Sequence, residues 1–98
     1  METLAKEITN YGYLHRQVKR VGNAALYEKI TSSGMPSGYE VIIVKQAKET
    51  EAFGKKYPDR EVYPSPEDFG TLAWSYAKLE NAEKNFSELV KNRAMMSL

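Results

Sequence analysis

The segment that most constrains the fold is the run Tyr-Glu-Val-Ile-Ile-Val-Lys from Tyr39 to Lys45. Its β-branched residues favour a strand, and the apolar stretch is too short for a helix. A strand that is apolar on both sides must be covered on both sides, so we expect it near the centre of a sheet. A chain of 98 residues normally builds one core, and we expect a single domain over residues 1–98.

The preceding segments predict further antiparallel strands. Tyr13 to Val21 and Ala25 to Thr31 are rich in β-branched and aromatic residues, and Gly22-Asn23 between them is typical of a two-residue hairpin turn. Strict alternation in the first of these strands places on one side Leu14, Arg16, Val18 and Arg20. The Ser, Gly and Pro residues of 31–38 predict a loop.

The second half has weaker strand signals and one clear helix. Residues 47–60 are polar and contain a glycine and a proline, so we expect an irregular, mobile connection, followed by a short edge strand from Arg60 to Tyr63. Ser65-Pro66-Glu67-Asp68-Phe69-Gly70 predicts one capped helical turn. A strand is favoured around residues 73–76, although helical spacing from Phe69 to Leu79 leaves a helix open there.

From Leu79 to about Arg93 the apolar residues recur at three- and four-residue intervals, which predicts an amphipathic helix. The fold class that follows is α+β, with an antiparallel β-meander sheet of four to five strands packed against this C-terminal helix. We expect a flexible segment at 1–10 and a frayed tail at 94–98.

Composition narrows the function. The chain has no cysteine and one histidine, which excludes thiolate metal sites and cysteine nucleophiles. His15 on a strand is better explained as exposed or sheet-packed, and Glu67 and Asp68 as first-turn helix acids, than as catalytic groups. No phosphate-binding glycine pattern occurs. We therefore expect no enzyme, no catalytic residues, no cofactor and no bound metal.

One candidate function is nucleic-acid binding. Residues 1–48 carry seven basic and four acidic side chains, against seven and nine in residues 49–98. Cations and tyrosines on a sheet can hold phosphates and stack bases. The candidate residues are Tyr13, Arg16, Lys19, Arg20 and Tyr27. A net charge of +1 is low for this class of protein.

The other candidate function is protein binding. Seven tyrosines and one tryptophan exceed what a small core needs, and tyrosine, tryptophan and arginine dominate interface hot spots. The candidate residues are Tyr57, Arg60, Tyr63 and Tyr76, and Trp74 is better explained as buried under the helix.

Residues 39–86 also show a recurrent pattern: the strand at 39–45, Phe53-Gly54-Lys55, Tyr57-Pro58, Arg60-Glu61, Pro64 to Gly70, Ala73-Trp74-Ser75-Tyr76 and Leu79 to Phe86. The pattern resembles small uncharacterised α+β proteins encoded by phages and prophages. Lys78 departs from it, because a threonine N-cap is usual there. The resemblance supplies no catalytic residues. It implies a setting in which small proteins block or redirect host machinery, including defence nucleases.

These observations lead to one leading function and one alternative. We expect a non-catalytic phage-type interaction protein that binds and inhibits or modulates a host or defence protein, in the manner of an anti-CRISPR or anti-defence protein. The alternative is the nucleic-acid-binding module. The N-terminal residues show no signal peptide, and no membrane span is seen, so we expect a cytoplasmic protein. A homodimer through the edge strand at 60–63 or the apolar tail is allowed.

Overall fold

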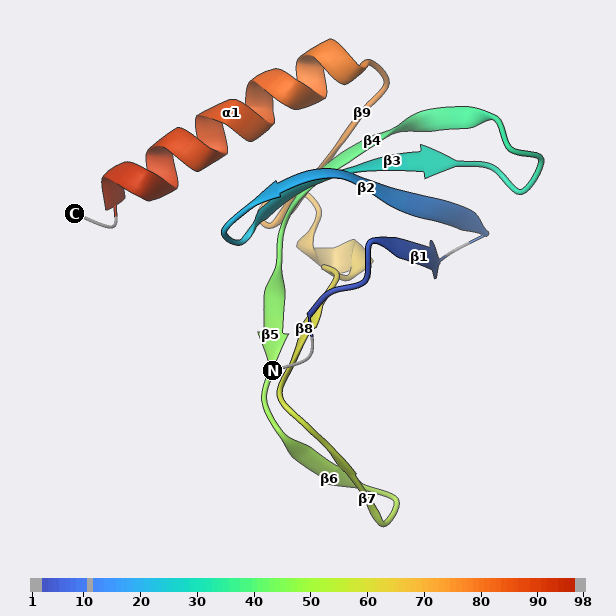
Figure 1. The fold of residues 1–98 in the computed structure, drawn as a ribbon, viewed down its shortest axis with the longest axis vertical. Helices are drawn as coiled ribbons and strands as arrows, with labels where there is room; N and C mark the ends of the chain where they lie inside the picture. Colours follow the sequence, from blue (N-terminus) through green and yellow to red (C-terminus); the bar gives the residue numbers. More distant parts are fainter. Residues whose placement is uncertain (1–2, 11, 97–98) are drawn as a thin grey trace.

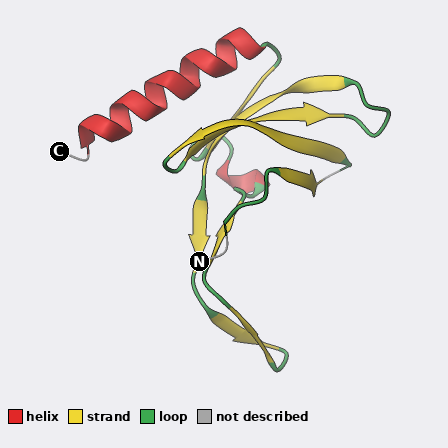
Figure 2. Ribbon diagram, viewed as in Figure 1, coloured by secondary structure: helices red, strands yellow, loops and turns green. Residues whose placement is uncertain are grey.

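The computed structural model describes residues 3–10 and 12–96 and contains a five-stranded antiparallel sheet packed against one helix (Figures 1 and 2). The strand order is β1-β2-β3-β4-β9. The bounds are β1 (Glu7–Asn10), β2 (Tyr13–Val21), β3 (Ala24–Ile30), β4 (Pro36–Ile43) and β9 (Ala73–Tyr76). The helix α1 (Leu79–Met96) follows β9 and lies across one face of the sheet, here called the α1 face. The predicted α+β class is confirmed.

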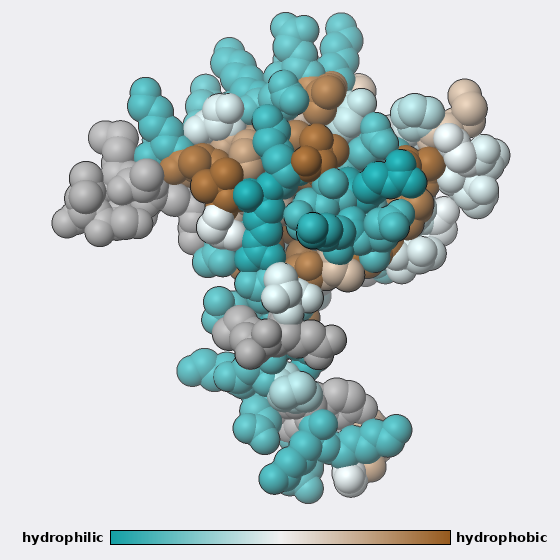
Figure 3. All heavy atoms as spheres, viewed as in Figure 1, coloured by the Kyte–Doolittle hydropathy of each residue, from teal (hydrophilic) through white to brown (hydrophobic). Residues whose placement is uncertain are grey.

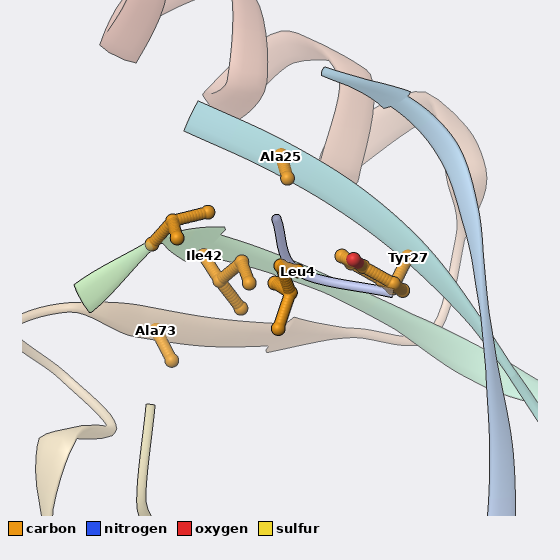
Figure 4. Close-up of a cluster of buried hydrophobic side chains, with 6 residues drawn as sticks. Leu4, Ala25, Tyr27, Ile42 and Ala73 are labelled. Atoms are coloured by element: carbon orange, nitrogen blue, oxygen red, sulfur yellow. The ribbon is translucent and has the colours of Figure 1, made fainter. Parts of the chain in front are cut away.

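Apolar side chains are buried on both sides of the sheet. On the α1 face the buried cluster comprises Ala24, Leu26, Val41, Ala82 and Phe86. On the opposite face it comprises Leu4, Ala25, Tyr27, Ile42, Val44 and Ala73 (Figure 4). Because neighbouring residues of β4 belong to different clusters, this strand is covered on both sides, as the apolar run predicts.

The chain between β4 and β9 forms two short ribbons instead of an irregular connection. β5 (Lys45–Ala47) pairs with β8 (Arg60–Val62), and β6 (Thr50–Ala52) pairs with β7 (Lys55–Tyr57). The hairpin of β6 and β7, residues 50–57, is here called the arm. In Figure 1 it extends away from the sheet at the bottom of the view. The expected edge strand at 60–63 is present as β8, whereas the expectation of an irregular 47–60 segment is wrong.

The predicted helical turn after β8 is a 3-10 turn, η1 (Pro66–Asp68). The backbone N–H and hydroxyl of Ser65 donate to Asp68 Oδ2 at 2.9 and 3.0 Å, which closes the turn. The ammonium of Lys45 donates to the same oxygen at 2.9 Å. These contacts, led by the one with Lys45, hold the pKa of Asp68 below its usual value. The turn is thereby tied to β5.

Two expectations about segment ends are wrong. Residues 3–10 are not a loose segment, because β1 pairs with β2 and Leu4 packs in the core of the opposite face. β4 begins at Pro36, three residues before the expected strand, so the loop after β3 is shorter than 31–38. In both cases pairing with a neighbouring strand extends the sheet beyond what local composition signals.

The helix includes residues 94–96 of the expected tail, and residues 97–98 lie outside the described residues.

A β-bulge in β2 changes which side chains share a face. Gln17 is opposite Tyr27, whereas Lys19 is opposite Leu26, so Val18 is an extra residue in the ladder. After the bulge the alternation is inverted, and Arg20 lies on the opposite face from Arg16. The prediction that both arginines share one side is therefore wrong.

Candidate functional site

The residues of the predicted nucleic-acid surface are divided between the two faces of the sheet. On the α1 face, Arg16 Nε lies 3.5 Å from a carboxylate oxygen of Glu7, and Lys19 Nζ lies 3.7 Å from one of Glu83. The Lys19 ammonium also lies 5.4 Å from the ring centroid of Phe86. These two cations are thus ion-paired on the side that carries the helix.

Arg20 makes a salt bridge on the opposite face. Its Nη1 and Nη2 donate to Oε1 and Oε2 of Glu61 at 2.6 and 2.7 Å, and the backbone N–H of Leu4 donates to Oε1 at 3.0 Å. The hydrogen bonds from Arg20, with that from Leu4, lower the pKa of Glu61 from 4.5 to about 2. The contact therefore joins β2, β8 and the N-terminal segment. Arg20 thus has a structural role, and both carboxylate oxygens of Glu61 accept hydrogen bonds from it.

Two predicted contact tyrosines lie against the core of the opposite face. Tyr27 is 0% exposed, and its hydroxyl donates to the carbonyl of Ala5 at 2.8 Å and accepts from Gln17 at 3.0 Å. The half-buried ring of Tyr63 meets Tyr27 edge-on, with 5.2 Å between the centroids. Tyr27 is not available for base stacking, and the Tyr63 ring contributes to packing.

The remaining predicted contact residues occupy separate places. Arg60 is half-buried on β8. Tyr76 packs against the α1-face cluster, and Trp74 is half-buried on the same face, opposite Val41. Tyr57 belongs to β7, and its side chain lies outside the described part of the chain. Among the candidates whose side chains are described, Tyr63 and Tyr76 therefore lie on opposite faces of the sheet.

A pocket of about 360 Å³ lies over the opposite face of the sheet. Its floor consists of side chains from five strands: Asn10, Tyr13, His15, Lys29, Glu40 and Ser75. Its wall comes from the segment after β8 and consists of Tyr63, Pro64, Pro66 and Phe69. The sheet register aligns the floor residues, and the turn η1 positions the wall.

Buried polar groups meet in the floor of this pocket. Glu40 Oε1 accepts from the Tyr63 hydroxyl at 2.6 Å and lies 3.4 Å from His15 Nε2, and Oε2 lies 3.9 Å from Lys29 Nζ. Burial favours a higher pKa for Glu40, but the contacts with His15, Tyr63 and Lys29 outweigh it and lower the pKa. Burial first, and the Glu40 charge second, raise the pKa of Tyr63 well above its usual value. Glu40 is thus an ionised acceptor and Tyr63 a neutral donor.

The tip of the arm carries an exposed aromatic side chain. Phe53 and Gly54 form its two-residue turn, with φ angles of 54° and 75°, and Phe53 is 100% exposed. The paired residues of the arm include Glu51 opposite Lys56, and hydrophilic side chains cover much of the lower part of the molecule in Figure 3. Phe53 is therefore a fully exposed apolar group at the tip of a hairpin whose exposed residues include Glu51, Lys55 and Lys56.

Comparisons with known proteins give no match: no protein-family model, curated protein or solved structure is significantly similar to this chain. Within residues 3–10 and 12–96, no helix has the length and apolar character needed to cross a bilayer. Over the same residues, no three acidic, histidine or cysteine side chains gather as metal ligands would.

Sequence reasoning missed both the pocket and the tip of the arm. His15 was explained as exposed or sheet-packed, and the structure confirms a buried position at 4% exposure, but its contact with Glu40 depends on strand pairing. The turn of the arm had a usable signal, because Phe53-Gly54 separates two short polar runs. Phenylalanine at the first turn position hides that signal, since asparagine, aspartate or glycine is usual there.

Proposed function

We propose that the protein is an interaction module that inserts Phe53, at the tip of the arm, into an apolar pocket of another folded protein. The observation that carries this proposal is the full exposure of Phe53 on a projecting hairpin. Burying a phenylalanine side chain gives about 1.5–3 kcal/mol of favourable free energy relative to leaving it exposed. The unbound protein does not gain this free energy at Phe53.

The backbone of Phe53 strengthens the argument. A φ of 54° lies in the left-handed region, where a residue with a Cβ is strained by about 1–2 kcal/mol. Asparagine or glycine would relieve the strain and increase the polarity of the tip. A strained, exposed aromatic residue at a turn is a reason to propose function there.

The charged residues of the arm define the partner further. Lys55, Lys56 and Glu51 are exposed beside the tip. A partner pocket that is apolar at its centre and polar at its rim would bury the ring and leave these charges in water. The phage setting and the inhibition of a host or defence protein stay predictions, and they fit a protein that acts by occupying a partner's surface.

The residue placement favours this function over the nucleic-acid alternative. Tyr27 is buried, and the three cations are ion-paired, with Arg16 and Lys19 on the α1 face and Arg20 on the opposite face, so the five candidate residues do not form one binding surface.

The test compares wild type with Phe53→Asn in affinity purification from bacterial lysate followed by mass spectrometry. Asparagine suits the turn, so we expect an unchanged or slightly higher unfolding temperature and at least about 30-fold weaker partner binding, equal to a hot spot of about 2 kcal/mol. Calorimetry with the purified partner would quantify this loss.

Met35→Asn is the matched control, because Met35 is 62% exposed in the connection between β3 and β4, outside the arm. We expect it to retain the partner. Recovery of the same proteins with all three forms would contradict the proposal. Recovery of nucleic acid alone would favour the alternative function.

A further inference from the structure

The tip of the arm and the pocket on the opposite face have complementary surfaces. Phe53 presents a fully exposed ring at the tip. The wall of the pocket is apolar and consists mainly of Phe69, Pro64 and Pro66. An aromatic side chain gains free energy when it leaves water and packs against other rings. The pocket therefore offers the kind of surface that the tip lacks within its own chain.

The pocket and the arm also match in size and shape. A volume of about 360 Å³ lies at the lower end of the range for small-molecule sites, so the pocket can enclose a single aromatic side chain. The arm is a narrow hairpin that carries Phe53 at its two-residue turn and extends away from the sheet (Figure 1). The ring can enter the pocket while the strands of the arm stay outside it.

The charges beside the two surfaces favour their contact. Lys55 and Lys56 follow the turn of the arm directly and are exposed. Glu67 is exposed in the turn η1, which positions the wall of the pocket. Within the pocket, Lys29 and Glu40 lie 3.9 Å apart and compensate each other. Opposite charges at the rim guide encounter and fix the orientation of two surfaces.

The strand pairing directs the tip away from the pocket of its own chain. β5 and β8 form the base of the arm, and Phe53 beyond them is 100% exposed. Over residues 3–10 and 12–96, the two strands of the arm pair with no third strand. A hairpin of two strands is only marginally stable in water. A second copy of the chain offers both a cover for the ring and a support for the hairpin.

We propose that the arm of one copy docks on the opposite face of a second copy and places Phe53 in its pocket, against Phe69 and the two prolines. Each copy carries both surfaces, so two copies can exchange arms and form a closed, symmetric dimer. This inference rests on the proposed function, because both use the same tip, and it adds a means of regulation. The dimer covers Phe53, and a protein partner must compete with the second copy for it.

The first test is sedimentation equilibrium of the full chain between about 10 µM and about 1 mM, the range in which a small interface is populated. We expect a dimer that weakens at least about tenfold in Phe53→Asn. Ser75→Arg places a long cationic side chain at an exposed position of the pocket lining and should weaken the dimer equally. Met35→Asn alters an exposed residue outside both surfaces and should dimerise as the wild type does.

A mixture of the two interface variants gives the sharpest test. Phe53→Asn retains the pocket and Ser75→Arg retains the tip, so the mixture restores one of the two contacts that each variant lacks alone. We expect the mixture to associate at concentrations at which each variant by itself is monomeric. With the Phe53→Asn protein labelled with ¹⁵N, the added Ser75→Arg protein should shift the backbone amide signals of Asn10, Phe69 and Ser75.

Several results would overturn the inference. These are a wild type that stays monomeric at about 1 mM, a dimer that survives both interface variants, an equal loss of the dimer in Met35→Asn, and a mixture that does not associate. Shifts confined to Leu14 and Ile30, which line another cavity, would also overturn it.

The inference and the proposed function can fail separately. If the wild type is monomeric and Phe53→Asn still loses its protein partner, the self-docking inference is wrong and the proposed function stands. If the dimer depends on Phe53 but Phe53→Asn captures the same proteins as the wild type, the proposed function is wrong and self-docking stands. Ser75→Arg should capture at least as much partner as the wild type, because its tip is intact and uncovered.

Discussion

Replacement of Glu61 by glutamine tests whether one salt bridge fastens β8 and the N-terminal segment to the sheet. The carboxylate of Glu61 accepts two hydrogen bonds from Arg20 and one from the backbone of Leu4. Glutamine keeps the shape of the side chain and removes its charge. The expected result is a lower free energy of unfolding at neutral pH, because the amide nitrogen of glutamine cannot accept one of the two hydrogen bonds from Arg20 and the remaining amide oxygen carries no negative charge.

The magnitude follows from the lowered pKa. A pKa of about 2 in the folded chain, against 4.5 for the free group, corresponds to a ceiling of about 3.4 kcal/mol. The side chains of Arg20 and Glu61 retain 18% and 12% exposure, and screening by water reduces the expected contribution to about 2 kcal/mol. Since the folded-state pKa is lowered, this contribution is complete above pH 4.5 and is lost as the pH falls toward 2.

The assay is urea unfolding of wild type and Glu61→Gln between pH 7 and pH 2.5, followed by the fluorescence of the single tryptophan, Trp74. The free energies of unfolding of the two proteins should differ by about 2 kcal/mol at pH 7, and this difference should shrink below pH 4.5. Glu7→Gln is the control, because its pair with Arg16 is more than half exposed and should contribute at most about 0.5 kcal/mol. If the difference in unfolding free energy between wild type and Glu61→Gln stays constant with pH, the reasoning is refuted.

Two further changes probe the opposite face of the sheet and its edge. Tyr63→Phe removes the hydroxyl that donates to Glu40 at 2.6 Å, and we expect a loss of about 1–3 kcal/mol in urea unfolding; a loss below about 0.5 kcal/mol would show that the buried carboxylate does not need this donor. Gly38→Ala places a Cβ 2.9 Å from the carbonyl oxygen of Tyr76 at a φ of 142°, and it should cost about 2 kcal/mol or more. Gly34→Ala, with a φ of 89° and open space, should cost about 1–2 kcal/mol, and equal losses in thermal unfolding would argue against the clash.

The elements that the sequence predicted well depend on local chemistry. The β-branched run at Tyr39 to Lys45, the Ser65-Pro66 cap and the helical spacing after Leu79 each act within one strand, turn or helix, and β4, η1 and α1 confirm them. β1 was missed because residues 7–10 have little strand signal of their own and gain their hydrogen bonds from β2.

The candidate sites depended on contacts that local patterns do not contain. Arg16, Lys19 and Arg20 look like one basic cluster in sequence, but the bulge at Val18 separates the two arginines onto different faces. Tyr63 looked available to a partner, and its packing against Tyr27 appears only when β8 is placed beneath the sheet.

The sequence by itself thus determined the class of fold, the buried strand β4 and the covering helix, because side-chain periodicity and capping are properties of neighbours in the chain. The tertiary structure decided which charges pair, that His15 meets Glu40 in a pocket, and that Phe53 stands exposed at the end of an arm. The contact of His15 with Glu40 joins residues 25 positions apart, and the faces taken by Arg16 and Arg20 depend on a single extra residue in the ladder, so strand pairing fixes both.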